Sequence, residues 1–327
     1  MLDKYKKILV TGGAGFIGSH LVDALLDLGK EVVIFDATIS GSPKNFSSKA
    51  KLIKGDIRKP EQIKEAVKGI DLVFHAAANA NGTFSVNNPQ LDFDINATGT
   101  LNILEAASQA KVKKFVYLSS AAVYGRPLYS PIDEKHSAEP YIPYGGAKYA
   151  GEVYCHVYLR AYHLPMIIGR SFCVYGSREN HKTALVEVSR YLRWHLNQKP
   201  IQIIGDIDKK IRDFVHVDDV VQGLLLIADC GGSGEVFNIG SGEATSMRKL
   251  VDIIGSVTGK EPITKVISEI QDDTYSLVAD ISKIKSIGYT PKIPLIDGIK
   301  QLAKKLGEFP EMPEGATIFQ KGQKSEK

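Results

Sequence analysis

Cysteine is scarce in this sequence, and its three copies are too scattered to build a cysteine-based architecture. Cys155, Cys173 and Cys230 include no C-x-x-C pair. We therefore predict neither a disulfide framework nor a zinc site, and no resident metal. Free cysteines of this kind are typical of a reducing compartment. The first residues also lead directly into an expected strand without a secretory apolar segment, so we expect a cytoplasmic protein.

Long apolar runs and a strong excess of one charge are also missing. No run approaches the roughly 20 apolar residues that cross a bilayer, so no membrane span is predicted. The 41 lysines and arginines against 37 aspartates and glutamates leave a formal charge of +4. This excess is too small to predict a nucleic-acid partner, although it suits a polyanionic small molecule.

The sequence does contain a regular alternation of short apolar runs with helical patterns. Several runs are apolar throughout, which is typical of strands buried on both faces of a parallel sheet. Strands and helices that alternate in this way predict an α/β protein with a doubly wound parallel sheet of the Rossmann type. We expect strands at 6–10, 31–36, 51–55, 71–77, 114–120 and 165–170, and helices at 15–28, 60–68, 88–110 and 144–163.

The pattern loosens after residue 170, and we expect this half to form a smaller C-terminal, substrate-binding lobe over the strand ends. Further helices are expected at 181–197, 217–229, 246–258 and 295–306, and strands at 202–206 and 235–240. The predicted division is a dinucleotide-binding domain at 1–169, to which 213–242 returns, a substrate-binding lobe at 170–212 and 243–307, and a flexible tail at 308–327.

A glycine-rich turn follows the first expected strand, where residues 11–18 read TGGAGFIG and open an amphipathic helix. Gly12 permits a tight turn, Gly15 lets a pyrophosphate approach backbone N–H groups, and Gly18 lets the helix pack closely on the strand. Such spacing arises by chance in glycine-rich chains and also in other α/β proteins. Its position between strand and helix predicts a dinucleotide site. The expected contacts in this turn are Gly12, Gly15, Phe16, Ile17 and Gly18.

Acidic residues follow the second and third expected strands. Asp36 ends the second strand. A carboxylate there can accept hydrogen bonds from both hydroxyls of the adenosine ribose and would repel a 2′-phosphate. The cofactor predicted from this position is NAD rather than NADP. Asp56 and Ile57 follow the third strand and could hold the adenine; the alternative is that both acids only form turns.

A hydroxyl, a phenol and an ammonium can be placed together near the end of the fifth expected strand. Ser120 ends that strand, and Tyr144 and Lys148 are four residues apart on a helix, so they share a face. A lysine ammonium and an oxidised nicotinamide would lower the pKa of the phenol. The phenolate could then take the proton of an alcohol while hydride leaves its carbon. The alternative is that Tyr144 and Lys148 are surface residues and Ser120 caps the strand.

Further stretches run through most of the chain: GDI at 55–57, HAAA at 75–78, INATGT at 95–100, SSAAVYG at 119–125, YGGAK at 144–148, RSFCVYG at 170–176, RDFVHVDD at 212–219 and ADISK at 279–283. With them, the chain resembles the extended short-chain dehydrogenase/reductase family, in its nucleotide-sugar epimerase/dehydratase branch. The resemblance implies that Ser120, Tyr144 and Lys148 are catalytic and that NAD stays bound. It also implies a homodimer formed through the helices near 88–110 and 144–163. The cofactor contacts that it adds are Ala76, Ala77, Asn96, Ser119, Tyr144 and Lys148.

Two residues after the catalytic hydroxyl help to select an activity within that branch. The 4,6-dehydratases of that branch carry an acid pair directly after the catalytic hydroxyl. This chain has Ala121 and Ala122 there, and alanine does no acid–base chemistry. This difference favours an NAD-dependent epimerase that acts on a nucleoside-diphosphate sugar at C4 through a 4-keto sugar. The alternatives are a net oxidoreductase or dehydratase acting on a nucleotide sugar or another secondary alcohol, and an inactive NAD-binding regulator.

The expected substrate contacts depart from the family pattern. Cys173 stands where family members usually have asparagine, Ile270 where they have a second arginine, and an asparagine-proline signature near 181–189 is absent. Arg212 remains the main expected phosphate contact, and a structural ion pair is its alternative. The complete set of expected substrate contacts is Ser120, Tyr124, Cys173, Arg178, Lys182 and Arg212.

Overall fold

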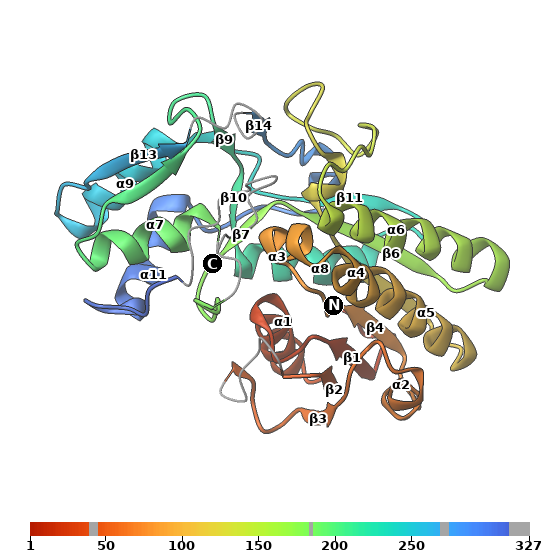
Figure 1. Ribbon diagram of the computed structural model, residues 1–327. Helices are drawn as coiled ribbons and strands as arrows, with labels where there is room; N and C mark the ends of the chain where they lie inside the picture. The colour runs from red at the N-terminus through yellow and green to blue at the C-terminus, as the bar shows by residue number, and fades with distance from the viewer. Residues whose placement is uncertain (39–44, 183–185, 269–274, 314–327) are drawn as a thin grey trace, which may run out of the picture.

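A seven-stranded parallel sheet forms the centre of the computed structural model, which describes residues 1–38, 45–182, 186–268 and 275–313 (Figure 1). Its strand order is β11-β6-β5-β4-β1-β2-β3. The chain therefore builds outwards from β1 to β3 and then crosses to β4, which leaves a crevice where the two directions part. The strands are β1 Lys7–Thr11, β2 Glu31–Asp36, β3 Lys51–Lys54, β4 Leu72–His75, β5 Lys114–Ser120, β6 Met166–Ser171 and β11 Val236–Ile239.

Helices cover both faces of the sheet, because each strand presents apolar side chains in both directions. In β1, Ile8 and Val10 belong to one core and Leu9 to the other. The first core includes α1 (Phe16–Asp27) and α8 (Val217–Cys230), which pack together. The helices α2 (Pro60–Ala66), α5 (Gly99–Gln109) and α6 (Pro143–Tyr162) cover the opposite face. These layers confirm the doubly wound fold expected from the sequence.

The helix expected at 88–110 is divided into three parts. It begins as α4 (Pro89–Phe93), widens into a π-helical segment (Asp94–Thr98) and continues as α5. A further short helix, α3 (Gly82–Asn87), precedes it. Single π turns inside α-helices are frequently found at functional sites, and here the widened turn carries the buried Asn96.

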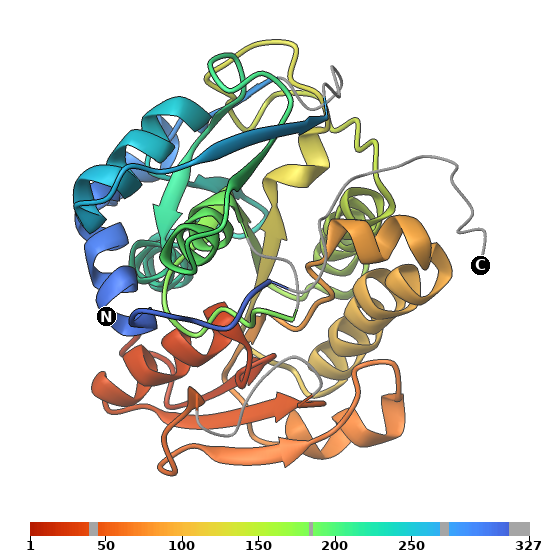
Figure 2. The same ribbon diagram turned by 60° about the vertical axis from the view of Figure 1, so that its left-hand side comes forward.

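The smaller lobe lies beside the sheet and has a core of its own (Figure 1 and Figure 2). The aromatic side chains of Tyr175, Tyr191 and Trp194 are buried in that core. Its main elements are α7 Glu187–Leu196, β8 Ile201–Ile204, α9 Met247–Thr258, β13 Thr264–Ser268 and α11 Leu295–Leu306. The remaining short elements are a 3-10 turn at Ala121–Tyr124, β7 Cys173–Tyr175, β9 Ile211–Arg212, β10 Phe214–His216, β12 Thr245–Ser246, β14 Ser276–Leu277 and α10 Ser282–Lys285.

The division into domains at 169, 212 and 242 remains a prediction. One segment packs differently from that division: Ile281, Ile284 and Tyr289 belong to the core of the central sheet rather than to that of the lobe. The first part of the expected tail is also packed, because the carbonyl oxygen of Glu311 accepts a hydrogen bond from the guanidinium of Arg193. Residues 314–327 of that tail lie outside the described residues.

The expected strands and long helices are present with boundaries shifted by a few residues. What the sequence did not predict are short strands of two to five residues, such as β9 and β13, and the two short helices α3 and α10. In the described part of the chain, no helix combines the length and apolar character needed to cross a bilayer.

Two glycines of the turn after β1 are required by close backbone contacts. Gly12 has a φ of 72°, and a Cβ there would lie 2.7 Å from the backbone of Ala77. A Cβ on Gly18 would lie 2.1 Å from the carbonyl oxygen of Gly12. By contrast, a Cβ on Gly15 would meet that same oxygen at 3.1 Å. Gly18 therefore sets how closely α1 approaches the turn.

We expect Gly18→Ala to destabilise the protein, because the new methyl group must push the backbone of the turn away from α1. Overpacking of this kind costs about 1–3 kcal/mol of unfolding free energy, which urea denaturation would measure. Gly146→Ala is the matched control, since no atom lies within 4 Å of a Cβ at that helical position. Equal stability of the two variants would contradict the steric role of Gly18.

Candidate active site

A cleft of about 310 Å³ opens at the carboxyl ends of the central strands. The glycine-rich turn forms one wall, and Ser119, Tyr144 and Lys148 form another. Every residue expected to contact the cofactor lines this cleft except Asn96. The residues so placed are Gly12, Gly15, Phe16, Ile17, Gly18, Asp36, Asp56, Ile57, Ala76, Ala77, Ser119, Tyr144 and Lys148. Their common position makes the cleft the candidate dinucleotide site.

Asp36 has a second task besides the one expected from the sequence. Its carboxylate accepts hydrogen bonds from the backbone N–H of Ala14, at 2.9 Å, and from that of Thr38, at 2.6 Å. The first bond holds the glycine-rich turn against the end of β2. A carboxylate oxygen can accept more than one hydrogen bond, so both oxygens can also accept from ribose hydroxyls.

Arg58 lines the cleft beside Asp56 and was not predicted from the sequence. Its guanidinium is bound by Asp56 through Nε at 3.0 Å and Nη2 at 2.5 Å. The hydrogen bond from Arg58 is the main reason that the pKa of Asp56 lies below its usual value. Because Asp56 neutralises this arginine, the ribose end keeps the negative charge of Asp36.

Tyr144 is half-buried at the cleft wall next to Ser120. Burial raises the pKa of Tyr144 to about 12; a hydrogen bond with Ser120 lowers it, and the negative charge of Asp92 raises it further. Lys148 and an oxidised nicotinamide together are expected to lower this pKa, but in the protein alone burial outweighs the hydrogen bond with Ser120. Without a further positive charge nearby, the phenol therefore keeps its proton at neutral pH.

Lys148 is almost fully buried, with 2% of its surface exposed. Burial lowers the pKa of Lys148 to about 8, while the charges of Glu152 and Asp92 raise it. Its Nζ also lies 4.2 Å from the centre of the Tyr117 ring, whose negative face attracts a cation. These contacts partly compensate the cost of burying the ammonium group.

Glu152 forms a buried ion pair behind the catalytic residues. Arg170 on β6 donates to it through Nε, at 2.9 Å, and Nη2, at 2.6 Å, and Ser119 donates through its hydroxyl, at 2.5 Å. The ion pair therefore ties α6 to the end of β6, and the hydrogen bond from Ser119 ties it to the end of β5, which also carries Ser120. Sequence reasoning missed it, although Glu152 continues the four-residue spacing of Tyr144 and Lys148.

Asn96 does not line the cleft but supports its wall from behind. Its side chain accepts from the backbone N–H of Asn79, at 2.9 Å, and donates to Asp92, at 2.9 Å. Asn79, which does line the cleft, donates to the same oxygen of Asp92 at 2.7 Å. The other oxygen of Asp92 is buried without a partner among the described residues, and burial raises the pKa of this carboxyl.

His75 at the end of β4 connects the turn after β1 to the π-helical segment. Its Nδ1 lies 2.6 Å from the Thr11 hydroxyl and its Nε2 lies 3.0 Å from the Thr100 hydroxyl. Burial lowers the pKa of His75 to about 3, so the ring is neutral. Since Thr100 donates to the carbonyl oxygen of Asn96, Nε2 is the nitrogen that donates, and Nδ1 accepts from Thr11. The histidine is therefore a structural connector.

The expected substrate contacts do not gather at the cleft. Arg178 lines it, but its guanidinium pairs with Asp23 at 2.6 Å. Tyr124 is fully buried, and its hydroxyl donates to Asn238 at 2.7 Å, which places it in the core rather than at the cleft wall. Ser120 is adjacent to the cleft through its hydrogen bond with Tyr144.

Arg212 and Cys173 lie on the side of the smaller lobe. The guanidinium of Arg212 donates to the carbonyl oxygen of Tyr275 at 2.7 Å and stacks 4.5 Å from the Tyr275 ring. Burial raises the pKa of Cys173 to about 12, so its thiol is protonated. Lys182 is exposed, and its backbone N–H donates to Asn180. Ile270 lies outside the described residues.

Glu179 is a cleft residue that the sequence analysis did not single out. Its carboxyl accepts from the backbone N–H of Gly176, at 2.9 Å, and from the hydroxyl of Ser189 on α7. Burial raises the pKa of Glu179 to about 7 in spite of these bonds. The residue fixes the turn at 177–180 to the smaller lobe.

Comparison with known proteins shows the family of this chain. The model of the NAD-dependent epimerase/dehydratase family matches residues 8–240. A protein of Methanocaldococcus jannaschii provisionally named as a UDP-glucose 4-epimerase is 41% identical, over 90% of this chain and 96% of its own length. The crystal structure of UDP-glucose 4-epimerase from Thermotoga maritima with UDP-glucose is 36% identical and superposes with a TM-score of 0.85, covering 90% of this chain and 97% of that one.

A second solved structure contains the cofactor. UDP-glucose 4-epimerase from Thermus thermophilus, in complex with NAD, is 30% identical and has a TM-score of 0.85, covering 90% of this chain and 97% of that one. The family match spans the sheet, the glycine-rich turn and the candidate catalytic residues. The chain belongs to the NAD-dependent epimerase/dehydratase family.

Proposed function

We propose that this chain is an NAD-dependent epimerase that inverts C4 of a nucleoside-diphosphate sugar. The observation that carries the proposal is the convergence of three groups in one cleft: the glycine-rich turn, Asp36, and the Tyr144–Lys148 pair with Ser120 beside it. Membership of the epimerase/dehydratase family and the likeness to 4-epimerases, one of them solved with UDP-glucose, support this reading over other alcohol chemistry.

The cleft fits NAD on the evidence of its own residues. The backbone of the turn leaves no room for a Cβ at Gly12 or Gly18, and the N-terminus of α1 lies directly after it. Backbone N–H groups at a helix N-terminus bind phosphate groups. Asp36 would bind the adenosine ribose, and Lys148 would bind the nicotinamide ribose. When bound, NAD supplies a hydride acceptor and a positive ring.

Tyr144 would act as the base that removes the proton from the sugar C4 hydroxyl. Its raised pKa makes it a weak base in the protein alone, so the positively charged ring and Lys148 must stabilise the phenolate. Ser120, which hydrogen-bonds Tyr144, would bind the same sugar oxygen and orient it. The phenol then returns the proton to that oxygen on the second half of the reaction, so the enzyme leaves the cycle unchanged.

The absence of a second acid–base pair favours epimerisation over elimination. Ala121 and Ala122 begin the 3-10 turn directly after Ser120, and neither carries a proton-transfer group. A net oxidoreductase remains the second candidate, since the same trio would oxidise a secondary alcohol if NAD exchanged freely. Retention of the cofactor through turnover separates the two activities.

The nucleoside diphosphate would lie toward the smaller lobe, where Arg212 and Lys210 are buried beside Glu187. We propose that Arg212 binds the diphosphate, with Lys182 as a further phosphate contact, whereas Arg178 pairs with Asp23 instead. The thiol of Cys173 lies close to the charges of Arg212 and Glu187. A thiol is a weaker hydrogen-bonding group than the amide of an asparagine. This chain would therefore bind the diphosphate differently from family members that have asparagine at this position.

We expect Tyr144→Phe to lower kcat by roughly 10²–10⁴-fold while NAD stays bound, because only the proton acceptor is lost. Native mass spectrometry of the purified protein would detect the retained dinucleotide. NMR of reactions with UDP-, GDP-, dTDP- and CDP-sugars would follow inversion at C4. Near-normal turnover by the phenylalanine variant would overturn the assignment of Tyr144, and accumulation of free NADH by the native chain would favour the oxidoreductase.

We expect Asp36→Ala to reduce the preference for NAD over NADP by roughly tenfold, the factor that about 1.4 kcal/mol produces. The variant removes the charge that repels a 2′-phosphate. Titration with NAD and with NADP would measure the two affinities. Asp36→Asn keeps an oxygen for the backbone of Ala14 and so separates the charge from the support of the turn. Asp27→Ala, at the exposed end of α1, is the control. Unchanged discrimination in both Asp36 variants would refute the ribose role.

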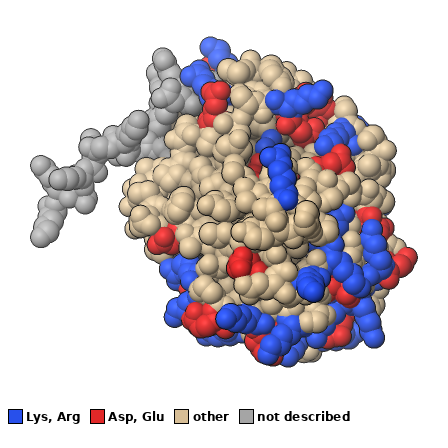
Figure 3. All heavy atoms as spheres, turned by 90° about the vertical axis from the view of Figure 1, so that its right-hand side faces the viewer, with Lys and Arg blue, Asp and Glu red and all other residues tan. Residues whose placement is uncertain are grey.

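We also propose that two copies associate through α4 and α6. Figure 3 shows the side on which Figure 1 places α5 and α6, with a broad uncharged area across its middle. Large apolar and aromatic side chains are exposed on α4 and α6, which pack together. They are Leu91, Phe93, Tyr149, Val153, Tyr154, Val157 and Tyr162. Apolar surface of this extent is unusual on a monomer, and a second copy would cover it with the same helices.

We expect the double variant Val153→Asp, Val157→Asp to weaken the dimer by roughly 100-fold or more, because it buries two charges in an apolar interface. Light scattering coupled to size-exclusion chromatography would measure the mass over a dilution series. Ile263→Asp, which changes an exposed apolar residue of the smaller lobe, is the control. A monomeric native chain, or an equally dimeric double variant, would contradict the proposed interface.

A further inference from the structure

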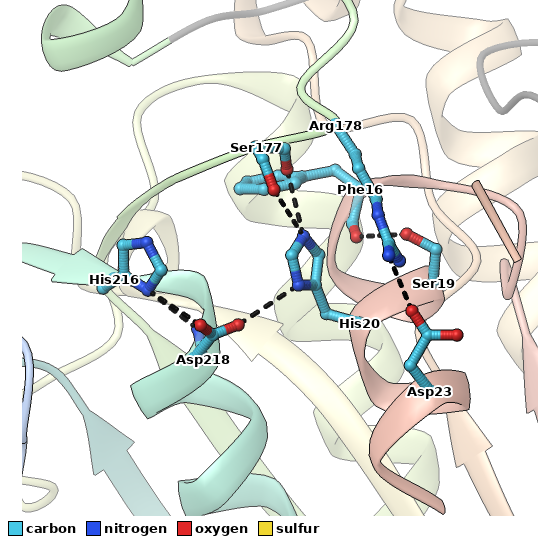
Figure 4. A network of polar contacts seen from close by, with 8 residues as sticks. All are labelled: Phe16, Ser19, His20, Asp23, Ser177, Arg178, His216 and Asp218. Atoms are coloured by element: carbon cyan, nitrogen blue, oxygen red, sulfur yellow. Dashed lines mark hydrogen bonds and ion pairs between the residues drawn. The ribbon is translucent and has the colours of Figure 1, made fainter. Parts of the chain in front are cut away.

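His20 on α1 joins three separate segments around the cleft (Figure 4). Its Nε2 lies 3.1 Å from the carbonyl oxygen of Ser177, and its Nδ1 lies 3.1 Å from a carboxylate oxygen of Asp218 at the start of α8. The imidazole ring also makes a T-shaped contact with the ring of Phe16, with a centroid distance of 6.2 Å and an interplanar angle of 88°. Phe16 lines the cleft, so His20 contacts one cleft wall directly.

The two ring nitrogens of His20 contact different segments. Besides the carbonyl oxygen, the hydroxyl of Ser177 lies 3.4 Å from Nε2, so this nitrogen makes two contacts with the turn at 177–180. The hydrogen bond from His20 is also the main reason that the pKa of Asp218 lies below its usual value. The neighbouring His216 faces the same carboxylate at 3.5 Å, and burial lowers its pKa. His20 therefore links Asp218, at the start of α8, to Ser177 in the turn at 177–180.

A second link lies one turn further along α1. Asp23 accepts a hydrogen bond from Arg178 at 2.6 Å. Arg178 has a φ of 69°, a left-handed conformation that residues other than glycine rarely adopt. The turn at 177–180 is therefore held in shape by its contacts. The next residue, Glu179, anchors the other side of the turn to the smaller lobe through Ser189.

The turn at 177–180 and the glycine-rich turn both line this cleft, the first through Arg178, Glu179 and Asn180 and the second through Gly12 and Gly15. A dinucleotide in this cleft would contact both turns. Movement of either turn away from the other would widen its path out of the cleft. His20 and Asp23 connect them without lining the cleft themselves.

We propose that His20 and Asp23 are positioning residues that fasten the turn at 177–180 over the cofactor and so keep NAD bound between turnovers. The inference rests on the proposed function and deepens it, since an epimerase returns the hydride to the sugar from which it came and gains nothing from releasing its cofactor. Both links are partly exposed: the side chains of Asp23 and Arg178 are 36% and 29% accessible, and that of Asp218 is 56% accessible. Each link therefore stabilises the position of the turn only modestly.

The test measures exchange of bound NAD without any substrate. The holoenzyme is mixed with an excess of ¹³C-labelled NAD, and native mass spectrometry follows the replacement of the bound cofactor. We expect His20→Gln and Asp23→Asn each to accelerate exchange three- to tenfold, and Asp23→Glu, which keeps the charge, to restore slow exchange. Asp208→Asn removes an exposed ion pair with Arg248 in the smaller lobe and is the matched control.

Thermal unfolding of the NAD-free variants separates fastening from general stability. Exchange that is faster in His20→Gln and Asp23→Asn, at unfolding temperatures close to the native one, supports the proposal. Exchange within twofold of the native rate in both variants would overturn it, as would equal acceleration by Asp208→Asn. If the native chain holds NAD but epimerises no sugar, the proposed function fails while the exchange rates still decide the role of His20.

Discussion

The ammonium of Lys148 is the charge around which the cleft is organised, because a buried cation is costly unless nearby groups compensate it. Glu152 and Asp92 supply negative charge, and the face of Tyr117 supplies a further attraction. Glu152 is in turn held by Arg170 and Ser119, and Asp92 by Asn79 and Asn96. The helix, strands and π-helical segment that carry these residues are thus fixed relative to one another by a single electrostatic requirement. The result is a site in which Tyr144 and Lys148 are held in place before any ligand arrives.

Much of the fold could be predicted because its signals are local. The apolar strands, the turn at residues 11–18 and the four-residue spacing of Tyr144 and Lys148 each require only neighbouring residues to be interpreted. The same holds for Asp36, which is placed by the end of its own strand. Contacts between distant segments could not be predicted in this way. Nothing near Arg170 in the sequence indicates that it binds Glu152, and nothing near His20 indicates that it reaches Ser177 and Asp218.

The pKa of Tyr144 shows what the structure adds to a chemical expectation from sequence. The expectation was that Lys148 and an oxidised nicotinamide together lower this pKa; in the protein alone, burial of the phenol dominates and raises it. Burial is a property of the whole fold and cannot be inferred from spacing. The same is true of Tyr124, whose position after the catalytic strand suggested a pocket residue although its side chain is packed in the core.

The double use of Asp36 constrains how this cleft could evolve. One carboxylate supports the glycine-rich turn through Ala14 and also presents the charge that would discriminate between the two dinucleotides. A substitution such as Asp36→Ala, which removes both oxygens, would admit the phosphorylated cofactor and also loosen the loop that has to receive it. A change of redox partner would therefore disturb this loop least through asparagine, which loses the charge but keeps an acceptor for the backbone of Ala14.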